Sequence, residues 1–227
     1  NDTSTLESVI EFTGSKDDLY IEISAESYEK MHLSNNDRYE FVYPNYSVSK
    51  LFDLNHNFFN NFELTSSGNQ KKHSTNIYEM SQINDLLIKS NNFFLKDLFT
   101  SNFKTLVKNV NTKGDNSTVY KKKTQSEILS NFIYDISLPM RKTEEKYTKF
   151  LTPKLSIRHS PSSTKNIQTL DRQLNIDNLF GLSRIGVNDD VEGGSSLTIG
   201  NEFSIKDYEE NDIFLINLGT VFIEKEN

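Results

Sequence analysis

Residues 178–200 read NLFGLSRIGVNDDVEGGSSLTIG, and this stretch decides the expected fold. An apolar pair, Leu179 and Phe180, precedes a polar loop rich in acidic residues and glycine, and a strand follows that loop. One face of the strand carries Leu197, Ile199, Phe203 and Ile205, and the other carries Ser196, Thr198, Gly200, Glu202 and Ser204. Apolar and polar residues that alternate with period two predict a strand with one apolar side. The stretch therefore predicts a β-hairpin in a large antiparallel sheet.

The same alternation recurs along the chain. In residues 19–26 the apolar face has Leu19, Ile21, Ile23 and Ala25, and the polar face has Tyr20, Glu22, Ser24 and Glu26. Further strands are expected within residues 6–12, 39–50, 58–64, 128–138, 149–158 and 212–224. We expect an all-β chain of about ten antiparallel strands with loops of very unequal length. Several of these strands run for ~9–12 residues, the length that a tilted strand needs to cross a bilayer.

The alternation weakens between Gln70 and Thr112. Residues 77–87 are compatible with a strand or a short helix, because Tyr78, Gln82 and Leu86 have helical spacing. If the strands line a barrel, we predict that this stretch contains a long loop or a segment that enters the lumen.

The composition fits a sheet with one apolar and one wet face. Only 35% of the 227 residues are hydrophobic, but 11% are aromatic, with 16 Phe and 10 Tyr. Disordered chains are poor in aromatic residues, so the low apolar content does not indicate disorder. An antiparallel sheet solvated on one side needs fewer apolar residues than a globule with a closed core.

Charge and cysteine content exclude several classes of function. The formal net charge is −7, whereas nucleic-acid binding depends on a basic surface, so no nucleic-acid partner is expected. The absence of cysteine excludes a disulfide scaffold, a cysteine zinc site and a thiol nucleophile. No signal peptide and no apolar run of ~18 residues are evident, and the chain reads as a fragment of something longer. Strands of a membrane β-barrel would escape such a search.

No pattern in the sequence indicates an enzyme. The four histidines are scattered singly, and no phosphate-binding or nucleophile motif is present. Asp189, Asp190 and Glu192 place three carboxylates close together, but they miss the spacing of a calcium loop, so a hairpin loop facing water or an interior is favoured. We therefore expect no catalytic residues, no metal ligands and no cofactor.

The aromatic residues near strand ends leave two interpretations open. Tyr39, Phe41, Tyr43 and Tyr46 surround Pro44, where a strand end or bulge is expected because proline donates no ladder hydrogen bond. These rings suit the interfaces of a bilayer. They equally suit ordinary cross-strand packing.

Several motifs in the second half occur in a characteristic order. They are FLTPKL at residues 150–155, SP at 160–161, DNLF at 177–180, SRIG at 183–186, DDVEGG at 189–194 and LTIG at 197–200. This order resembles the barrel part of the LPS-assembly outer-membrane protein family, LptD, also called OstA or organic solvent tolerance protein. The matching positions are Pro153, Leu179, Phe180, Arg184, Gly186, Asp189, Asp190, Glu192, Gly193, Leu197 and Gly200. The chain departs from the family at Val187, where an aromatic residue is frequent, and at Asn188–Asp190, where the family has an Asp-Arg pair.

The resemblance implies a segment of a large transmembrane β-barrel in the outer membrane of a Gram-negative bacterium. Such a barrel passes lipopolysaccharide to the outer leaflet, with an LptE-like lipoprotein plug and a periplasmic LptA-like bridge as partners. The apolar faces of residues 19–25 and 197–205 would then face outer-membrane lipid, and arginine at Ile199 would be costly but arginine at Thr198 would not. The lumen-facing residues would include Glu22, Glu26, Asn131, Asp135 and Glu202.

Two other classes of protein remain open at this point. One is another outer-membrane barrel, such as a porin or a TonB-dependent receptor. The other is a soluble carbohydrate-binding β-sandwich, which predicts shorter strands and an apolar core between two sheets.

Overall fold

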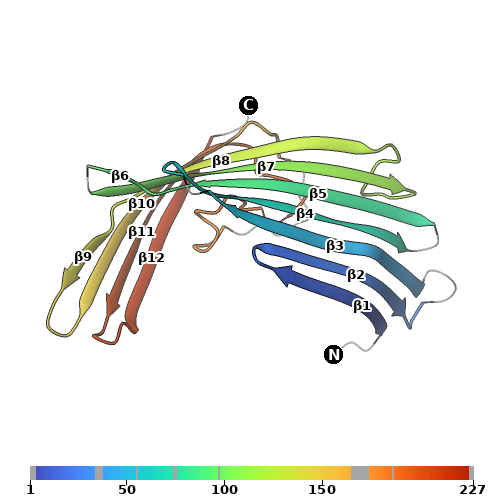
Figure 1. Ribbon diagram of the computed structural model, residues 1–227, viewed down its shortest axis with the longest axis horizontal. Coiled ribbons are helices and arrows are strands. Elements are labelled where there is room, and N and C mark those ends of the chain that lie inside the picture. Colours follow the sequence, from blue (N-terminus) through green and yellow to red (C-terminus); the bar gives the residue numbers. More distant parts are fainter. Residues whose placement is uncertain are drawn as a thin grey trace. The chain divides into compact units, whose positions relative to one another are not determined.

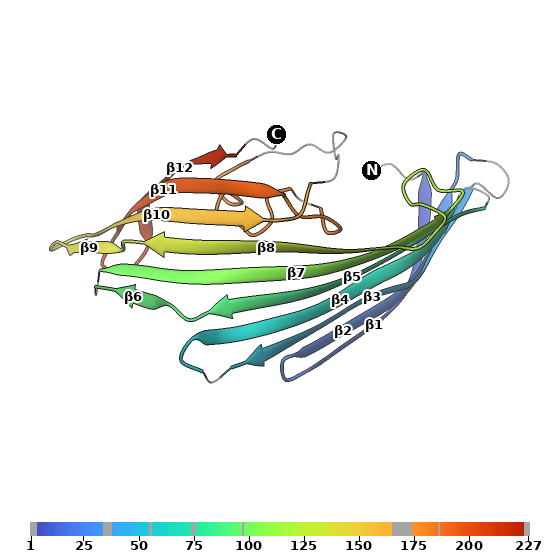
Figure 2. The ribbon, with the colours of Figure 1, turned by 90° about the horizontal axis from the view of Figure 1, so that it is seen from above.

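The structure is a computed structural model that describes residues 4–33, 38–54, 56–73, 76–96, 98–164, 174–185 and 187–224. The described residues form twelve strands (Figures 1 and 2), and no helix is among these elements. The strands are β1 (Thr5–Lys16), β2 (Leu19–Lys30), β3 (Tyr39–Asp53), β4 (Phe59–His73), β5 (Ile77–Ser90), β6 (Phe93–Leu95), β7 (Phe99–Asp115), β8 (Gln125–Ser137), β9 (Met140–Thr143), β10 (Thr148–Ser160), β11 (Gly194–Lys206) and β12 (Asp212–Ile223). In the part of the chain that is described, no helix is long and apolar enough to span a membrane.

The strands make one antiparallel sheet. Its order is β1-β2-β3-β4-β5-β7-β8-β10-β11-β12, with the short β6 beside β7 and β9 beside β10. Nearly every strand therefore pairs with its neighbour in sequence, and Figure 2 shows β2 to β5 running side by side. The expected all-β antiparallel fold is confirmed, whereas closure of the sheet into a transmembrane barrel stays a prediction.

The prediction of a long loop or inserted segment between Gln70 and Thr112 is wrong. These residues form the end of β4, all of β5 and β6, and most of β7, which is 17 residues long. The alternation is hard to read there because polar side chains stand on the side that is apolar elsewhere, and apolar side chains such as Ile83 and Val110 are buried on the other. The helical spacing of Tyr78, Gln82 and Leu86 is a coincidence of this mixed pattern.

The chain divides into two compact units, which are described separately. Unit 1 comprises Asn1–Asp53, Asn61–Leu87 and Val107–Ile128, and unit 2 comprises Leu54–Asn60, Ile88–Leu106 and Leu129–Asn227.

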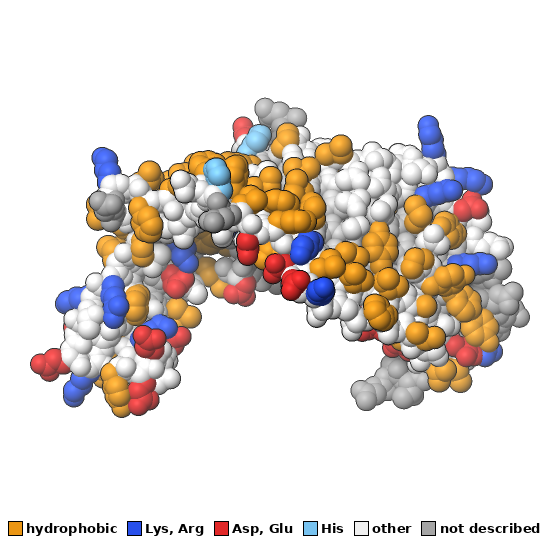
Figure 3. Space-filling view, viewed as in Figure 1, with side chains coloured by type: hydrophobic (Ala, Val, Ile, Leu, Met, Phe, Trp, Pro, Cys, Tyr) orange, Lys and Arg blue, Asp and Glu red, His pale blue; other side chains and the backbone are white. Residues whose placement is uncertain are grey.

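Unit 1 has two chemically distinct sheet faces. In the register of β1, β2 and β3, Ile23 lies between Phe12 and Tyr46, which gives an apolar face. On the opposite side Glu22 lies between Thr13 and Ser47, which gives a face that we call the carboxylate face. Hydrophobic side chains crowd the surface over β2 and β3 (Figure 3), in agreement with 45% exposure of Ile23. The predicted alternation of β2 is therefore confirmed, and it leaves an apolar surface open on one side.

Unit 2 also has two faces, but one of them is covered. On β10 and β11, Ile157 and Ile199 are exposed, whereas their sequence neighbours Arg158 and Thr198 are each only 2% exposed. On β8, Leu129 and Ile133 share a face with Asn131 and Asp135, and both are buried there. An apolar residue is tolerated on a polar face when another part of the chain excludes water from that face.

The aromatic residues show cross-strand packing. Phe52 on β3 stacks on its register partner Phe62 on β4, with ring centroids 4.6 Å apart. In unit 2, Phe58, Phe93 and Phe103 form contacts with centroid separations of 5.1–5.3 Å. Of the rings around Pro44, Tyr39 and Phe41 of the same strand stack with centroids 6.2 Å apart, and both interpretations of this group stay predictions.

Candidate functional site

The segment that covers unit 2 is the polar loop of the sequence motif. Residues 174–185 and 187–193, which we call the covering loop, pack on the side of β8, β10, β11 and β12 that carries Asn131, Arg158 and Thr198, which we call the covered face. The Asn131 side-chain amide donates to the carbonyl of Leu182, and the Thr198 hydroxyl donates to the carbonyl of Leu179 at 3.5 Å. The covering loop, orange in Figure 1, thus lies against the strands β8 and β11.

Two facing glycines make a seat for the apolar pair at the start of the covering loop. Gly200 on β11 and Gly219 on β12 are register partners in the sheet. A Cβ atom at Gly200 would lie 2.6 Å from the Phe180 ring, and one at Gly219 would overlap the Leu179 side chain. The missing side chains therefore create the space into which Leu179 and Phe180 fit.

A buried ion-pair cluster fixes the other end of the covering loop. The Arg184 guanidinium donates two hydrogen bonds to the Glu192 carboxylate, Nε to Oε2 at 2.8 Å and Nη2 to Oε1 at 2.6 Å. Arg158 of β10 reaches the same carboxylate, with Nη2 to Oε1 at 2.9 Å, and its Nη1 donates to the Glu192 carbonyl at 2.7 Å. The hydroxyl of Ser196 accepts from Arg184 Nη2 at 3.0 Å.

The ion pairs of this cluster hold the covering loop on the sheet. Arg158 and Arg184 are 2% and 5% exposed, so both guanidinium groups have lost most of their hydration. Desolvated charges are tolerated when they are paired and hydrogen-bonded, and Glu192 supplies both requirements for both arginines. Bidentate arginine–carboxylate geometry also fixes the direction from which the loop approaches the strands.

The remaining motif residues are distributed around this cluster. The Gly193 amide donates to the Thr164 hydroxyl at 2.7 Å, Asp190 is buried, and Asp189 is partly buried. Pro153 and Leu197 instead belong to strands: the carbonyl of Pro153 accepts from the Leu138 amide, and Leu197 lies on the face opposite the loop, between Ile157 and Phe222 in register. Gly186 lies outside the described residues.

The residues expected to face a lumen do share faces with other polar groups. In unit 2, Asn131 lies under the covering loop, Asp135 pairs with Lys104 at 3.3 Å, and Glu202 pairs with Lys154 at 2.7 Å. In unit 1, Glu22 and Glu26 lie on the carboxylate face, where they accept hydrogen bonds from Tyr20 and Tyr28. The sidedness of these residues is a feature of the structure, and the lumen itself stays a prediction.

Sequence reasoning missed the partner of the motif's charged residues. Arg158 ends the strand that was expected within residues 149–158, but nothing in its neighbourhood indicated a contact with Glu192, which is 34 residues further along the chain. Two signals were available. The acidic loop contains Arg184 close in sequence to Glu192, and Arg158 lies among the small side chains of Ser156, Ser160 and Ser196. Small neighbours leave room for a large side chain from elsewhere to fold over them.

The arrangement is suited to holding a loop in place. Among the described residues, no group of three or more histidine, aspartate or glutamate side chains is placed to hold a metal ion. A search against protein-family models finds no match for this chain, and no curated protein sequence matches it.

Proposed function

We propose that this chain forms part of the wall of an outer-membrane β-barrel that passes lipopolysaccharide to the outer leaflet. One observation carries the proposal: long antiparallel strands present an exposed apolar face, with Ile23, Ile157 and Ile199 all more than 40% exposed, while the other face is polar or covered. Lipid would cover the apolar face, as it does in transmembrane barrels.

Two further features support this proposal. The strands of the main sheet path are 12–17 residues long, which exceeds the ~9–11 residues required to cross a bilayer at a tilt. Leu179, Phe180 and Gly200 hold one end of the covering loop on the covered face, and Arg184 and Glu192 hold the other end, so several positions of the resemblance to the LPS-assembly family serve one structural role. A single covered face inside a wide barrel leaves room for an amphiphile whose sugars and phosphates stay hydrated.

The β-sandwich alternative requires a second sheet to bury the apolar faces. The described strands form one sheet, and many of their large apolar side chains are exposed. This observation favours a membrane-bound wall over a soluble binding module.

The test is fractionation of the full-length parent protein, followed by depletion. We expect the protein in the outer membrane, with heat-modifiable mobility in gels, and we expect depletion to reduce lipopolysaccharide at the cell surface. A soluble product would overturn the barrel. A membrane barrel whose depletion leaves surface lipopolysaccharide unchanged would point to a porin or receptor instead.

A further inference from the structure

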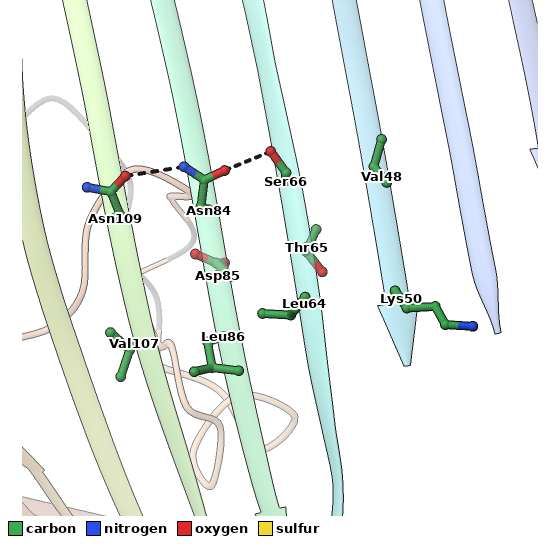
Figure 4. A pocket seen from close by; sticks show the side chains of 10 residues that line it. All are labelled: Val48, Lys50, Leu64, Thr65, Ser66, Asn84, Asp85, Leu86, Val107 and Asn109. Carbon is green, nitrogen blue, oxygen red and sulfur yellow. Dashed lines mark hydrogen bonds between the residues drawn. The ribbon is translucent and has the colours of Figure 1, made fainter. Parts of the chain in front are cut away.

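The apolar face of unit 1 is interrupted by polar side chains on three neighbouring strands. The Ser66 hydroxyl of β4 donates to the Asn84 amide oxygen of β5 at 2.7 Å, and the Asn84 amide nitrogen donates to Asn109 of β7 at 3.2 Å. Figure 4 shows these bonds, with Leu64, Leu86 and Val107 to one side of them. Alternation along each strand adds three further amides to the same face. We call the resulting set the amide patch, and its members are Ser66, Gln70, Gln82, Asn84, Asn109 and Asn111.

The strands that precede the amide patch are apolar on this face. In register, Phe12, Ile23 and Tyr46 lie side by side on β1, β2 and β3, and alternation places Ile10 and Ile21 on the same side. The amide patch is thus a local feature of β4, β5 and β7 and not a property of the whole face. It carries no charge, because its members are amides and one hydroxyl.

The middle of the amide patch lies in the hydrocarbon layer of the proposed barrel wherever along β5 the crossing begins. The strand has 14 residues, and a crossing takes ~9–11 of them. Any run of nine consecutive residues within Ile77–Ser90 includes residues 82–85. Gln82 and Asn84 therefore belong to the membrane-crossing part of the strand, on the side opposite to the carboxylate face.

Lipid is a poor cover for these amides. The Asn109 amide oxygen accepts from Asn84 and, at 2.6 Å, from the Asn111 amide nitrogen, but within the described residues the amides of Gln70 and Gln82 have no hydrogen-bond partner. Hydrocarbon cannot supply a partner. A second protein surface can, and amide and hydroxyl side chains stabilise contacts between transmembrane segments for this reason.

We propose that the amide patch is the contact between two copies of this protein that lie side by side in the membrane. Each amide both donates and accepts hydrogen bonds, so the patch is complementary to itself, and an uncharged patch does not repel its own image. Both copies insert in the same orientation, so a twofold axis along the membrane normal places the same residue of each copy at the same depth. This inference rests on the proposed membrane location and goes beyond it.

A hollow beside the amide patch adds apolar surface to the contact. It has a volume of about 430 Å³, and its lining includes Val48, Leu64, Leu86 and Val107. Leu64 is 44% exposed and Val107 is 36% exposed, so apolar side chains of the second copy can pack against them. The contact would combine hydrogen bonds with van der Waals packing, which are the two main attractions between protein segments inside a bilayer.

Photo-cross-linking of the full-length protein in its native membrane tests what covers the amide patch. A photoreactive p-benzoylphenylalanine replaces Gln82 or Asn84, and the control carries it in place of Ile23, which is 45% exposed on the same face. We expect a product of twice the monomer mass, containing this protein alone, from positions 82 and 84 but not from position 23. A product with a different protein, equal products from all three positions, or no product would each overturn the proposed contact.

Co-purification of two differently tagged copies from detergent extracts tests the role of the amides. Gln82→Leu with Asn84→Leu should reduce co-purification by about tenfold, because each substitution removes amide groups from both copies. The matched control is Ser8→Leu with Ser27→Leu, two register partners on the same face outside the patch, and it should leave co-purification unchanged. Undiminished co-purification of the Gln82/Asn84 variant would overturn the contact, since leucine suits a surface that lipid covers.

Membrane fractionation separates failure of this inference from failure of the proposed function. A soluble protein would overturn the barrel and the contact together. A protein that fractionates with the outer membrane but forms no pairs would overturn the contact alone, and neither experiment depends on lipopolysaccharide transport.

Discussion

The covered face of unit 2 and the carboxylate face of unit 1 differ in how their carboxylates are held. Both are polar sides of antiparallel strands, and both carry carboxylates. On the carboxylate face, Glu26 accepts hydrogen bonds from Ser24 at 2.6 Å, Tyr28 at 2.8 Å and Asn45 at 2.8 Å, all from the same or the adjacent strand. On the covered face, Glu192 comes from a distant loop and holds two buried arginines.

The comparison shows what a covering loop requires of the charges beneath it. The Glu26 carboxylate accepts hydrogen bonds from neutral groups only, so its loss leaves no charge unpaired. A carboxylate that neutralises two desolvated guanidinium groups has no substitute when it is lost. The two faces should therefore respond very differently to the same substitution.

The largest expected effect is at Glu192. Glu192→Gln leaves Arg158 and Arg184 buried without a counter-charge, which should lower the free energy of unfolding by about 3–5 kcal/mol. Equilibrium unfolding of the protein in detergent would measure this loss. The matched control is Glu26→Gln, for which we expect a smaller loss of about 1 kcal/mol, because its partners Ser24, Tyr28 and Asn45 are neutral and no buried cation is left unpaired. Similar losses for both variants would contradict the difference between the faces.

Arginine substitutions compare the two sides of one open strand. Ile23→Arg should cost about 2–4 kcal/mol if its position is near the bilayer midplane, whereas Glu22→Arg, on the carboxylate face, should cost much less. Unfolding from lipid vesicles measures both. Equal effects would remove the distinction between a lipid face and a wet face in unit 1.

The corresponding pair in unit 2 corrects an expectation from the sequence. Arginine at Thr198 was expected to be harmless on a face open to water, but Thr198 is buried under the covering loop and bonds to Leu179. Arginine at either Ile199 or Thr198 should therefore be destabilising, for different reasons. Alternation identifies the two sides of a strand, but it does not say what lies over each side.

The glycine seat gives a smaller effect with a clear geometric cause. Gly200→Ala would push a methyl group into the Phe180 ring and against the carbonyl of Leu218, so we expect a loss of about 1–3 kcal/mol from overpacking. Faster proteolysis within the covering loop should accompany the loss. The control is Gly14→Ala in unit 1, where the nearest atom would be 3.6 Å away, an ordinary contact. Unchanged protease resistance in Gly200→Ala would show that the glycines do not determine the position of the covering loop.

Sequence patterns predicted the parts of the sheet whose two faces differ cleanly. The strands β2 and β11 were predicted because every second residue meets the same surroundings over their length. Patterns failed for β5 and β7, where Asn84 and Asn109 interrupt the apolar side and Val110 is buried on the other side. The two amides are hydrogen-bonded to each other across the strands, so the sequence of a single strand does not reveal the pair.

The candidate site was predictable as a set of residues but not as an arrangement. The motif positions Arg184 and Glu192 were identified by resemblance, and their mutual contact follows from proximity in sequence. The contact with Arg158 depends on the path by which the covering loop returns over β10, and no local preference encodes that path. Long-range pairing between a loop and a strand has no periodicity from which it could be read.

The smallest expected effect is at the exposed turn between β11 and β12, where charge is neither covered nor shared with a distant segment. Hydrogen bonds from the side chain and backbone of Asn211, together with one from the Glu209 amide, hold the pKa of the Asp207 carboxyl below its ordinary value. Because the folded pKa is lowered, the stabilisation is present above the ordinary pKa of aspartate and is lost as the pH falls through the lowered folded value. The protection of the turn amides, measured relative to the intrinsic exchange rate at each pH, should therefore fall only in acid, and Asp207→Ala should remove that dependence while leaving protection in the covering loop unchanged. If acid loosened the covering loop and the turn together, the turn would belong to the same cooperative unit as the Glu192 cluster. That result would contradict the expected difference between covered and exposed charges.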